Sequence, residues 1–421
     1  MSGKERIIEV NHLPMDIERD GVYSINQPNP NSYTHGMFKY PCKFIPEIPR
    51  WAIRKYLKDK KAVIFDPFAG SGTTLLEANV NGYCAWGTEI DDIAKLIIQV
   101  KTTRLSEEQY EMLDKEFENL ASNIDNTSLP SYRPLIQNLE HWFSEEAIGR
   151  LGRLKYLAEG IEDGEVKDFL KLCFVSIIKR VSKADDTSPK PYVSNKIIKN
   201  PPDVLKEFTA VFKRYRQMMR ELMDAEQAGT TTIIEGDALD FQMDKGIDLS
   251  VTSPPYINAF DYGRTMRLEN LWLATLTEEQ LRDKKKLYVG TEKIILKDER
   301  EDMEILNRSG LLKKYYDSIA KADEKRALVV KKFFEDMETN LKLVFDQLNP
   351  KGKYMIVIGS STIRNVHVES WRVFEELGQN IGFQTIDSYS YIIQNPYIRI
   401  PRNGVGGKVS KDYVLVMEKG R

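Results

Sequence analysis

Apolar residues along the chain occur in short runs that alternate with stretches of helical periodicity. Residues 62–65, 83–88, 247–251 and 352–359 are compact apolar runs bounded by turn residues, which is typical of buried strands. Apolar positions recur with helical spacing at 46–57, ahead of the first run. This succession of strand, loop, helix and strand predicts an α/β fold, with helices on both faces of a sheet.

Two long helical stretches interrupt this rhythm, and they predict large, mainly helical insertions. The second stretch is dense in charges of both signs, and we expect its residues 281–332 to form a solvated helical insertion. The first residues are polar and irregular, which indicates an arm or linker. The predicted division is an N-terminal arm (1–32), a first core part (33–102), a helical insertion (103–228), a second core part (229–267), a charged helical insertion (268–345) and C-terminal core strands (346–421).

The amino-acid composition is that of a globular protein, and it bears on whether nucleic acid, metal ions or membranes are partners. The 421 residues are 41% hydrophobic and 29% charged, with a formal net charge of −2. That balance excludes a uniformly basic nucleic-acid coat but is compatible with a basic cleft. The three cysteines and four histidines are scattered, so we expect no metal site and a reducing, cytoplasmic location. We see no signal peptide and no apolar run near 18 residues, which argues against export or membrane insertion.

The first candidate site is a glycine-rich loop, Asp-Pro-Phe-Ala-Gly-Ser-Gly-Thr-Thr at 66–74, where a strand passes into a helix. Gly70 and Gly72 allow a ligand to approach the backbone closely. A third glycine is missing, which disfavours a dehydrogenase, and the Gly-Lys-Ser/Thr of a phosphate-binding P-loop is missing too. Asp66 suits an ammonium group, and Glu89, after the next strand, suits a ribose diol. S-adenosylmethionine is a ligand that carries both an ammonium group and a ribose diol.

The second candidate site is Ser253-Pro254-Pro255-Tyr256, directly after the apolar run at 247–251. Two successive prolines cannot continue a sheet ladder, so the chain leaves the strand and carbonyl groups remain without ladder partners. A rigid polar edge beside an aromatic ring suits a flat heterocycle that carries an exocyclic amine.

Together, these two motifs resemble those of the DNA amino-methyltransferases, which methylate adenine N6 or cytosine N4. The resemblance covers roughly residues 33–92, 230–266 and 350–420. It implies a Rossmann-like methyltransferase sheet, S-adenosylmethionine as the cofactor, and double-stranded DNA as the partner, with a cognate restriction endonuclease as a further candidate partner. The cofactor loop precedes the Pro-Pro-Tyr motif, which makes the insertion at 103–228 the candidate target-recognition domain.

The resemblance also implies roles for individual residues. The Ser253 side chain and the Pro254 carbonyl would accept hydrogen bonds from the amine, and Tyr256 would stack on a base flipped out of the duplex. Ser-Pro-Pro is associated with cytosine N4 and Asp-Pro-Pro with adenine N6, so we favour cytosine and keep adenine as the alternative. The candidate catalytic residues are Ser253, Pro254, Pro255 and Tyr256, and the candidate cofactor-binding residues are His35, Pro41, Asp66, Phe68, Gly70, Gly72, Thr73, Glu89, Asp237 and Ala238.

A basic cluster in the first insertion is a candidate DNA-binding surface. Between residues 176 and 220 the chain carries eleven basic and four acidic residues, an excess of seven positive charges. Such an excess favours contacts with phosphates, although a solvated helical face would also carry many lysines. The candidate DNA-binding residues are Lys183, Lys190, Tyr192, Asn258, Asp261, Tyr262, Arg264, Arg399 and Arg402.

Two other functional classes remain as alternatives. An RNA amino-methyltransferase would share the catalytic motif, but we recognise no RNA-binding module before the cofactor loop. A nucleotide-binding regulatory protein without chemistry is disfavoured by the intact motif at 253–256.

Overall fold

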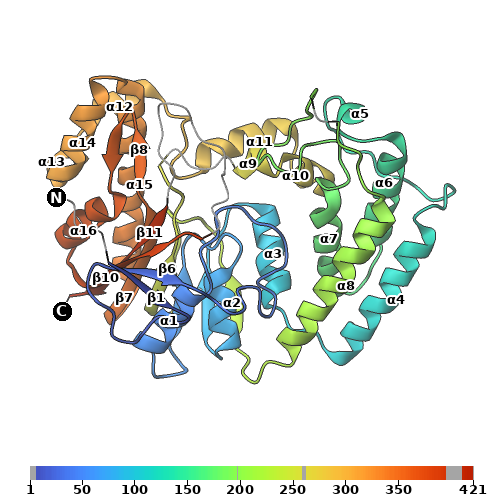
Figure 1. Cartoon of the computed structure of the whole chain (residues 1–421), viewed down its shortest axis with the longest axis horizontal. Helices are drawn as coiled ribbons and strands as arrows, with labels where there is room; N and C mark the ends of the chain where they lie inside the picture. Colours follow the sequence, from blue (N-terminus) through green and yellow to red (C-terminus); the bar gives the residue numbers. More distant parts are fainter. Residues whose placement is uncertain (1–5, 197, 258–261, 395–409, 421) are drawn as a thin grey trace.

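The computed structural model of the chain describes residues 6–196, 198–257, 262–394 and 410–420. Figure 1 shows a sheet-containing part on one side and a helical part on the other, with helices α9 (Tyr262–Thr265), α10 (Arg267–Leu273) and α11 (Glu278–Lys284) between them along the upper side of the view. The α/β fold with additional helical regions is therefore confirmed.

One mixed sheet organises the described residues. Strand β11 is antiparallel to both of its neighbours, β10 and β7, and the other neighbouring strands run parallel. Its nine strands among the described residues lie in the order β1 (Ile7–Val10), β2 (Gly21–Ile25), β10 (Phe383–Ile392), β11 (Lys411–Lys419), β7 (Leu348–Gly359), β6 (Ile247–Thr252), β3 (Val63–Asp66), β4 (Cys84–Gly87) and β5 (Thr230–Ile233).

Helices cover both faces of this sheet, and the alternation of side chains along each strand decides which face a residue joins. On β3, Ile64 packs with helices α1 (Glu47–Tyr56), α2 (Thr73–Val80) and α3 (Asp92–Thr102), whereas Phe65 packs on the opposite face. The opposite face is covered by α14 (Gly310–Ala320), α15 (Glu324–Gln347) and α16 (Ser370–Ile381).

The chain changes direction across the sheet between β3 and β6. From β3 it continues through α2 to β4 on one side, and from β6 it continues through α15 to β7 on the other. The two strands pair in parallel, with Ile64 opposite Leu249 and Phe65 opposite Ser250. Their carboxyl ends therefore lie side by side, which is where α/β sheets of this kind bind ligands.

Two expectations from the sequence are wrong. The first residues are not an irregular arm, because β1 and β2 extend the sheet and β2 pairs with β10, Tyr389 lying opposite Gly21. The stretch 281–332 is not solvated throughout either, because it contributes buried residues such as Ile305, Leu312 and Ala327 to the core. Helix α15 buries an apolar stripe against the sheet, made of Ala327, Val330, Phe333, Phe334, Met337, Leu341 and Val344.

The first insertion is helical as expected, and its apolar side chains form one core with those of α2, α3 and α10. Phe117 of α4 stacks on Phe212 of α8, with ring centroids 4.0 Å apart. Trp272 of α10 is fully buried in the same core, edge-on to Phe143 and Phe174. The helices of this part are α4 (Glu107–Asn123), α5 (Leu139–Trp142), α6 (Glu145–Glu159), α7 (Gly164–Ile178) and α8 (Val204–Met223).

The remaining elements are short. Beside the main sheet, β8 (Ser361–Ile363) and β9 (Val366–Val368) form a hairpin. The second insertion also contains the 3-10 turn η1 (Lys285–Leu287), α12 (Leu296–Glu301) and α13 (Ile305–Arg308).

Candidate active site

The glycine-rich loop turns from β3 into α2 through two left-handed residues. Gly70 has φ +52° and Gly72 has φ +73°, a region that glycine enters without the cost borne by other residues. Gly72 is the N-cap of α2 and offers no side chain to cap it. A Cβ atom on Gly72 would come within 3.0 Å of the Ile98 side chain, so α3 leaves no room for a larger residue.

Glu89 joins this loop to the turn after β4. Its Oε2 accepts from the backbone N–H of Gly70 at 2.8 Å, and its Oε1 accepts from the N–H groups of Ile90 and Asp91, also at 2.8 Å. Burial, followed by the negative charge of Asp91, raises the pKa of Glu89 to about 7. A carboxylate oxygen can accept more than one hydrogen bond, so Glu89 retains capacity for ligand hydroxyl groups.

Asp66 links the two candidate motifs to each other. Its Oδ1 accepts from the Thr252 hydroxyl at 2.6 Å and from the Phe68 N–H at 3.0 Å. The Thr74 hydroxyl donates in turn to the carbonyl of Val251 at 3.1 Å. Asp66 is fully buried, and this burial raises its pKa to about 6. The start of the cofactor loop is therefore tied to the residue that precedes Ser253.

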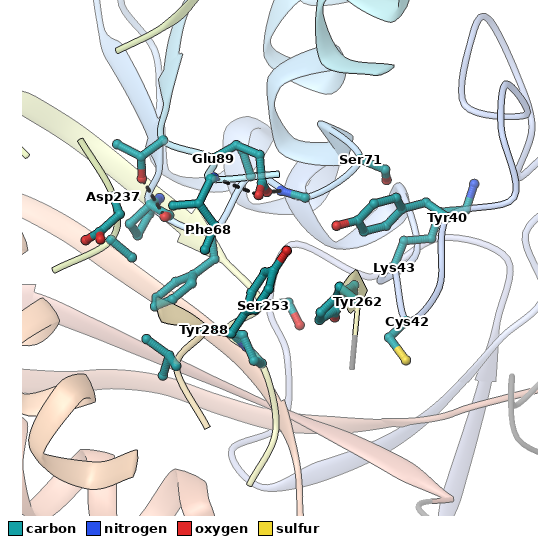
Figure 2. Close-up of a pocket in the computed structure, with 18 of the residues that line it drawn as sticks. Tyr40, Cys42, Lys43, Phe68, Ser71, Glu89, Asp237, Ser253, Tyr262 and Tyr288 are labelled. Carbon is teal, nitrogen blue, oxygen red and sulfur yellow. Dashed lines mark hydrogen bonds between the residues drawn. The ribbon is translucent and has the colours of Figure 1, made fainter. Parts of the chain in front are cut away.

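One pocket lies where these elements meet, with about 780 Å³ of space outside the protein atoms, part of it open to solvent. Figure 2 shows its lining side chains converging from the two halves of the sheet, the segment before the loop, and the second insertion. The lining residues are Tyr40, Cys42, Lys43, Phe44, Pro67, Phe68, Ala69, Gly70, Ser71, Thr73, Thr88, Glu89, Ile90, Asp237, Ala238, Leu239, Ser253, Pro255, Tyr262, Leu287, Tyr288 and Val289.

Comparisons with known proteins agree with this geometry. The family described as DNA methylase, which comprises N6 and N4 enzymes, matches residues 4–99. The Type II methyltransferase M.MvaI of Kocuria varians is 26% identical, over 92% of this chain and 90% of its own length. These matches are to DNA amino-methyltransferases, the family that the two sequence motifs resemble.

Other members are similar at lower identity or over less of the chain. M.BsoBI of Geobacillus stearothermophilus is 26% identical, over 61% of this chain and 56% of its own length. M.AvaI of a Nostoc species is 21% identical, over 85% and 80%. A solved S-adenosylmethionine-dependent methyltransferase from Methanosarcina mazei is 10% identical with a TM-score of 0.33, over 88% of this chain and 97% of that one, a likeness too low to support an argument.

The cofactor of this chain is S-adenosylmethionine, and the pocket fits it. Ser71 Oγ is buried without a hydrogen-bond partner and lines the pocket, so it can serve the polar amino-acid end. Oδ1 of Asp237 accepts a hydrogen bond from the Leu239 N–H at 2.7 Å. This leaves Oδ2 to accept from the adenine amine of the cofactor. Phe68, Ala238 and Val289 supply apolar wall for a ring.

The pocket brings together about half of the residues predicted for catalysis and cofactor binding. The predicted residues that line it are Phe68, Gly70, Thr73, Glu89, Asp237, Ala238, Ser253 and Pro255. Those that do not line it are His35, Pro41, Asp66, Gly72, Pro254 and Tyr256. Asp66 does not line the pocket: its Oδ1 accepts from Thr252 and Phe68 and orders the loop, whereas its Oδ2 is buried without a hydrogen-bond partner.

His35 is structural. It is 1% exposed, and its Nε2 lies 2.8 Å from Glu77 Oε1, while Arg50 donates two hydrogen bonds to the same carboxylate. Burial lowers the pKa of His35 to about 4, so the ring is neutral at physiological pH. The segment around it reaches the pocket through Tyr40 and Lys43 instead, which the sequence did not single out.

Tyr256 lies behind the pocket wall. Its hydroxyl donates to Asp412 Oδ1 at 2.5 Å, and the Tyr391 hydroxyl donates to Oδ2 of the same carboxylate at 2.9 Å. Asp412 belongs to β11 and Tyr391 to β10, so the candidate catalytic motif is fastened to strands that lie beyond β7 in the sheet. Stacking of Tyr256 on a target base stays a prediction.

Of the residues predicted to contact DNA, Tyr262 lies in the pocket, where it stacks on Tyr40 with ring centroids 5.7 Å apart. Lys190 and Tyr192 are exposed on the loop between α7 and α8, and Lys183 donates from its Nζ to the Glu140 carbonyl. Arg264 lies in α9 and has interactions within the protein. Asn258, Asp261, Arg399 and Arg402 lie outside the described residues.

Part of the basic cluster is paired with acids, and two of these acids are distant in the sequence. Arg216 donates two hydrogen bonds of 2.6 Å to Asp114, and Arg220 pairs in the same two-pronged way with Glu107. Arg180 and Lys199 both pair with Asp186. The free positive charge of this region is therefore smaller than its composition indicates.

Metal sites and membrane spans were also sought in the described part of the chain. Its histidine, cysteine, aspartate and glutamate side chains form no group of three or more placed to hold a metal ion. None of its helices combines the length and the apolar character needed to cross a bilayer.

Proposed function

We propose that the chain transfers the methyl group of S-adenosylmethionine to the N4 amine of a cytosine that is flipped out of double-stranded DNA at a specific sequence. We propose further that it protects DNA alongside a cognate restriction endonuclease, as the Type II names of its relatives indicate for those proteins.

The observation that carries the proposal is the shared pocket. Ser253 and Pro255 of the acceptor motif line the same space as Phe68, Gly70 and Glu89 of the cofactor half. The hydrogen bond between Thr252 and Asp66 holds the two halves in one arrangement. An amine next to Ser253 would therefore lie within the space that also receives the cofactor, and positioning of this kind accounts for most of the catalysis.

The protein has to make an exocyclic amine nucleophilic enough to accept a methyl group. An exocyclic amine is a poor nucleophile, because its lone pair is delocalised into the ring. The Ser253 hydroxyl and the Pro254 carbonyl would accept hydrogen bonds from the amine out of the ring plane, and so favour a pyramidal nitrogen. When bound, S-adenosylmethionine supplies an electrophilic methyl group for direct displacement. The base must leave the duplex to enter such a pocket.

The choice of base rests on Ser253. The amino-methyltransferases that begin this motif with serine are associated with cytosine N4, and those that begin it with aspartate with adenine N6. Adenine N6 is the second candidate for the same pocket, and methylation of RNA the third.

Nucleoside analysis tests the base. The protein is incubated with S-adenosylmethionine and either duplex DNA or a tRNA pool, and the nucleic acid is digested and analysed by mass spectrometry. We expect N4-methylcytosine from the duplex. N6-methyladenine alone would overturn the choice of base, and methylation of the tRNA alone would overturn the choice of DNA.

A serine substitution tests the assigned role. Ser253→Ala should lower kcat by about 100-fold, the usual effect of removing one catalytic hydrogen-bonding group, and leave the cofactor Kd within about twofold. The matched control is Ser318→Ala on α14, which lies outside the pocket lining and should leave both constants unchanged. Equal losses of kcat and of cofactor affinity in Ser253→Ala would contradict the role given to this residue.

A further inference from the structure

Part of the second insertion enters the cofactor pocket. Leu287, Tyr288 and Val289, which follow α11, line it together with the cofactor loop. Their sequence carries no signal that we connect with cofactor binding, and the two motifs that carry the family resemblance lie outside this stretch.

Two side-chain contacts attach this segment to the turn that bears Glu89. The Tyr288 hydroxyl donates to Asp91 Oδ2 at 3.2 Å, while Oδ1 of the same carboxylate caps α3 by accepting from the Ala94 N–H at 3.0 Å. Asp91 is 1% exposed. Four residues before Tyr288, the Lys284 ammonium pairs with Asp92 at 3.3 Å. The segment is thus held at the start of α3, directly after Glu89.

Tyr288 belongs to a row of aromatic rings that lines the pocket. Its centroid lies 6.0 Å from that of Tyr262, and Tyr262 in turn stacks on Tyr40. In Figure 2 the Tyr288 side chain projects into the pocket beside Phe68, with its hydroxyl directed towards the Glu89 side. An apolar ring face is therefore presented next to the carboxylate that suits a ribose diol.

Leu287 supplies an independent observation. It is 61% exposed although it lines the pocket, whereas its neighbour Val289 is 5% exposed. An exposed leucine on a concave surface gains from being covered by a ligand, because that removes apolar area from water.

We propose that Tyr288 is a cofactor-contacting residue, which packs its ring against the nucleoside part of S-adenosylmethionine while Asp91 holds its hydroxyl and Leu287 covers the outer side. This deepens the proposed function and rests on it only in taking the pocket as the S-adenosylmethionine site. The second insertion thereby contributes a wall of the cofactor site.

Direct binding measurements without DNA test the proposal. The probes are S-adenosylhomocysteine and 5′-methylthioadenosine, which share the nucleoside and differ in the amino-acid end, and calorimetry gives the Kd of each. Tyr288→Ala should raise both Kd values by about tenfold, or about 1.4 kcal/mol at 25 °C. Tyr288→Phe keeps the ring and should raise them by about threefold. Leu287→Ala should give an intermediate increase.

Matched controls exist elsewhere on the surface. Tyr156→Ala on α6 and Leu135→Ala remove a tyrosine and a leucine that are 46% and 83% exposed and lie outside the pocket lining. Both should bind the two probes as the unsubstituted protein does. Circular dichroism and thermal unfolding of Tyr288→Ala show whether it is folded, and Tyr288→Phe keeps the test decisive if it is not.

Kd values of Tyr288→Ala within twofold of the unsubstituted protein for both probes would overturn the proposal. A loss for S-adenosylhomocysteine alone would also overturn it, because the ring would then act at the amino-acid end. Neither result depends on which base is methylated. Detection of N6-methyladenine would conversely overturn the proposed base and leave this inference intact.

Discussion

Asp412 is a buried carboxylate that accepts hydrogen bonds from two tyrosines, and this arrangement makes the role of Tyr256 testable. Both hydroxyls donate to it, one from the catalytic motif and one from β10. Burial raises the pKa of Asp412 above its ordinary value, and the two donors oppose that shift. The arrangement offers a comparison between two substitutions that remove chemically identical groups from the same acceptor.

Tyr256→Phe and Tyr391→Phe should each lower the free energy of unfolding by about 1–3 kcal/mol, because each takes one donor from a buried carboxylate. Only Tyr256→Phe should also lower kcat, by about tenfold, because only Tyr256 fastens the Ser253–Pro255 wall. Urea unfolding and steady-state kinetics give the two quantities. If kcat fell equally in both variants, the loss would come from Asp412 itself and Tyr256 would have no separate positioning role.

The sequence could identify Ser253, Phe68 and Glu89 as pocket residues, because they belong to motifs whose chemistry is local. It could not identify Tyr288 or Tyr40, whose positions depend on packing between distant segments. It also overestimated Asp66 and His35. Both carry groups suited to a ligand, but His35 is engaged by Glu77 and Oδ1 of Asp66 by Thr252, partners that only the folded chain brings close.

Among the elements, the turn from β3 into α2 has the least freedom to change. Gly72 combines a positive φ with a close approach to α3. Gly72→Ala should lower the free energy of unfolding by about 1–2 kcal/mol from the left-handed conformation alone, with a further loss where Ile98 must shift. The cofactor Kd should rise as well, because the neighbouring loop residues line the pocket.

Gly164→Ala is the matched control, measured in the same urea titrations. Gly164 begins α7 without a positive φ, and a Cβ atom there would meet nothing within 4 Å. Its stability should stay within about 1 kcal/mol, shifted in the stabilising direction. Equal stabilities of Gly72→Ala and the unsubstituted protein would show that this turn tolerates a side chain.

Strands β3, β6 and β7 were predictable because they are mostly buried on both faces and form continuous apolar runs, whereas β4 is fully buried on one face only. Strands β1 and β2 were not. They are short, and their place in the sheet depends on β10, more than 350 residues further along the chain. Helix α15 was misjudged because its many charges obscured a regular apolar stripe that packs on the sheet.

For DNA binding by the whole molecule, the distribution of unpaired positive charge matters more than the net charge. Arginines that appeared available for DNA in the sequence, such as Arg220, are paired with acids of another helix, whereas Lys190 is exposed on the loop before α8. Partners more than 100 residues apart could not be paired from the sequence, so the excess of positive charge was overestimated.

Lys190→Ala should weaken duplex DNA binding and reduce the slope of log K against log salt by about 1, the value for one lost phosphate contact. Arg220→Ala should leave both unchanged, because its guanidinium is already engaged by Glu107. Fluorescence anisotropy at several salt concentrations gives the slopes. A larger effect from Arg220→Ala than from Lys190→Ala would reverse this assignment of the DNA-facing surface.

The hydrogen bond between Asp66 and Thr252 spans 186 positions of sequence, and the strands that bear these residues are direct neighbours in the sheet. The site therefore depends on adjacency across the sheet and not on the order in which the chain visits its two halves. The first and last strands of the chain, β1 and β11, belong to the same sheet. A circularly permuted gene, with the old termini joined and new ones opened in the first insertion, would reverse the order of the two motifs and still assemble the same pocket.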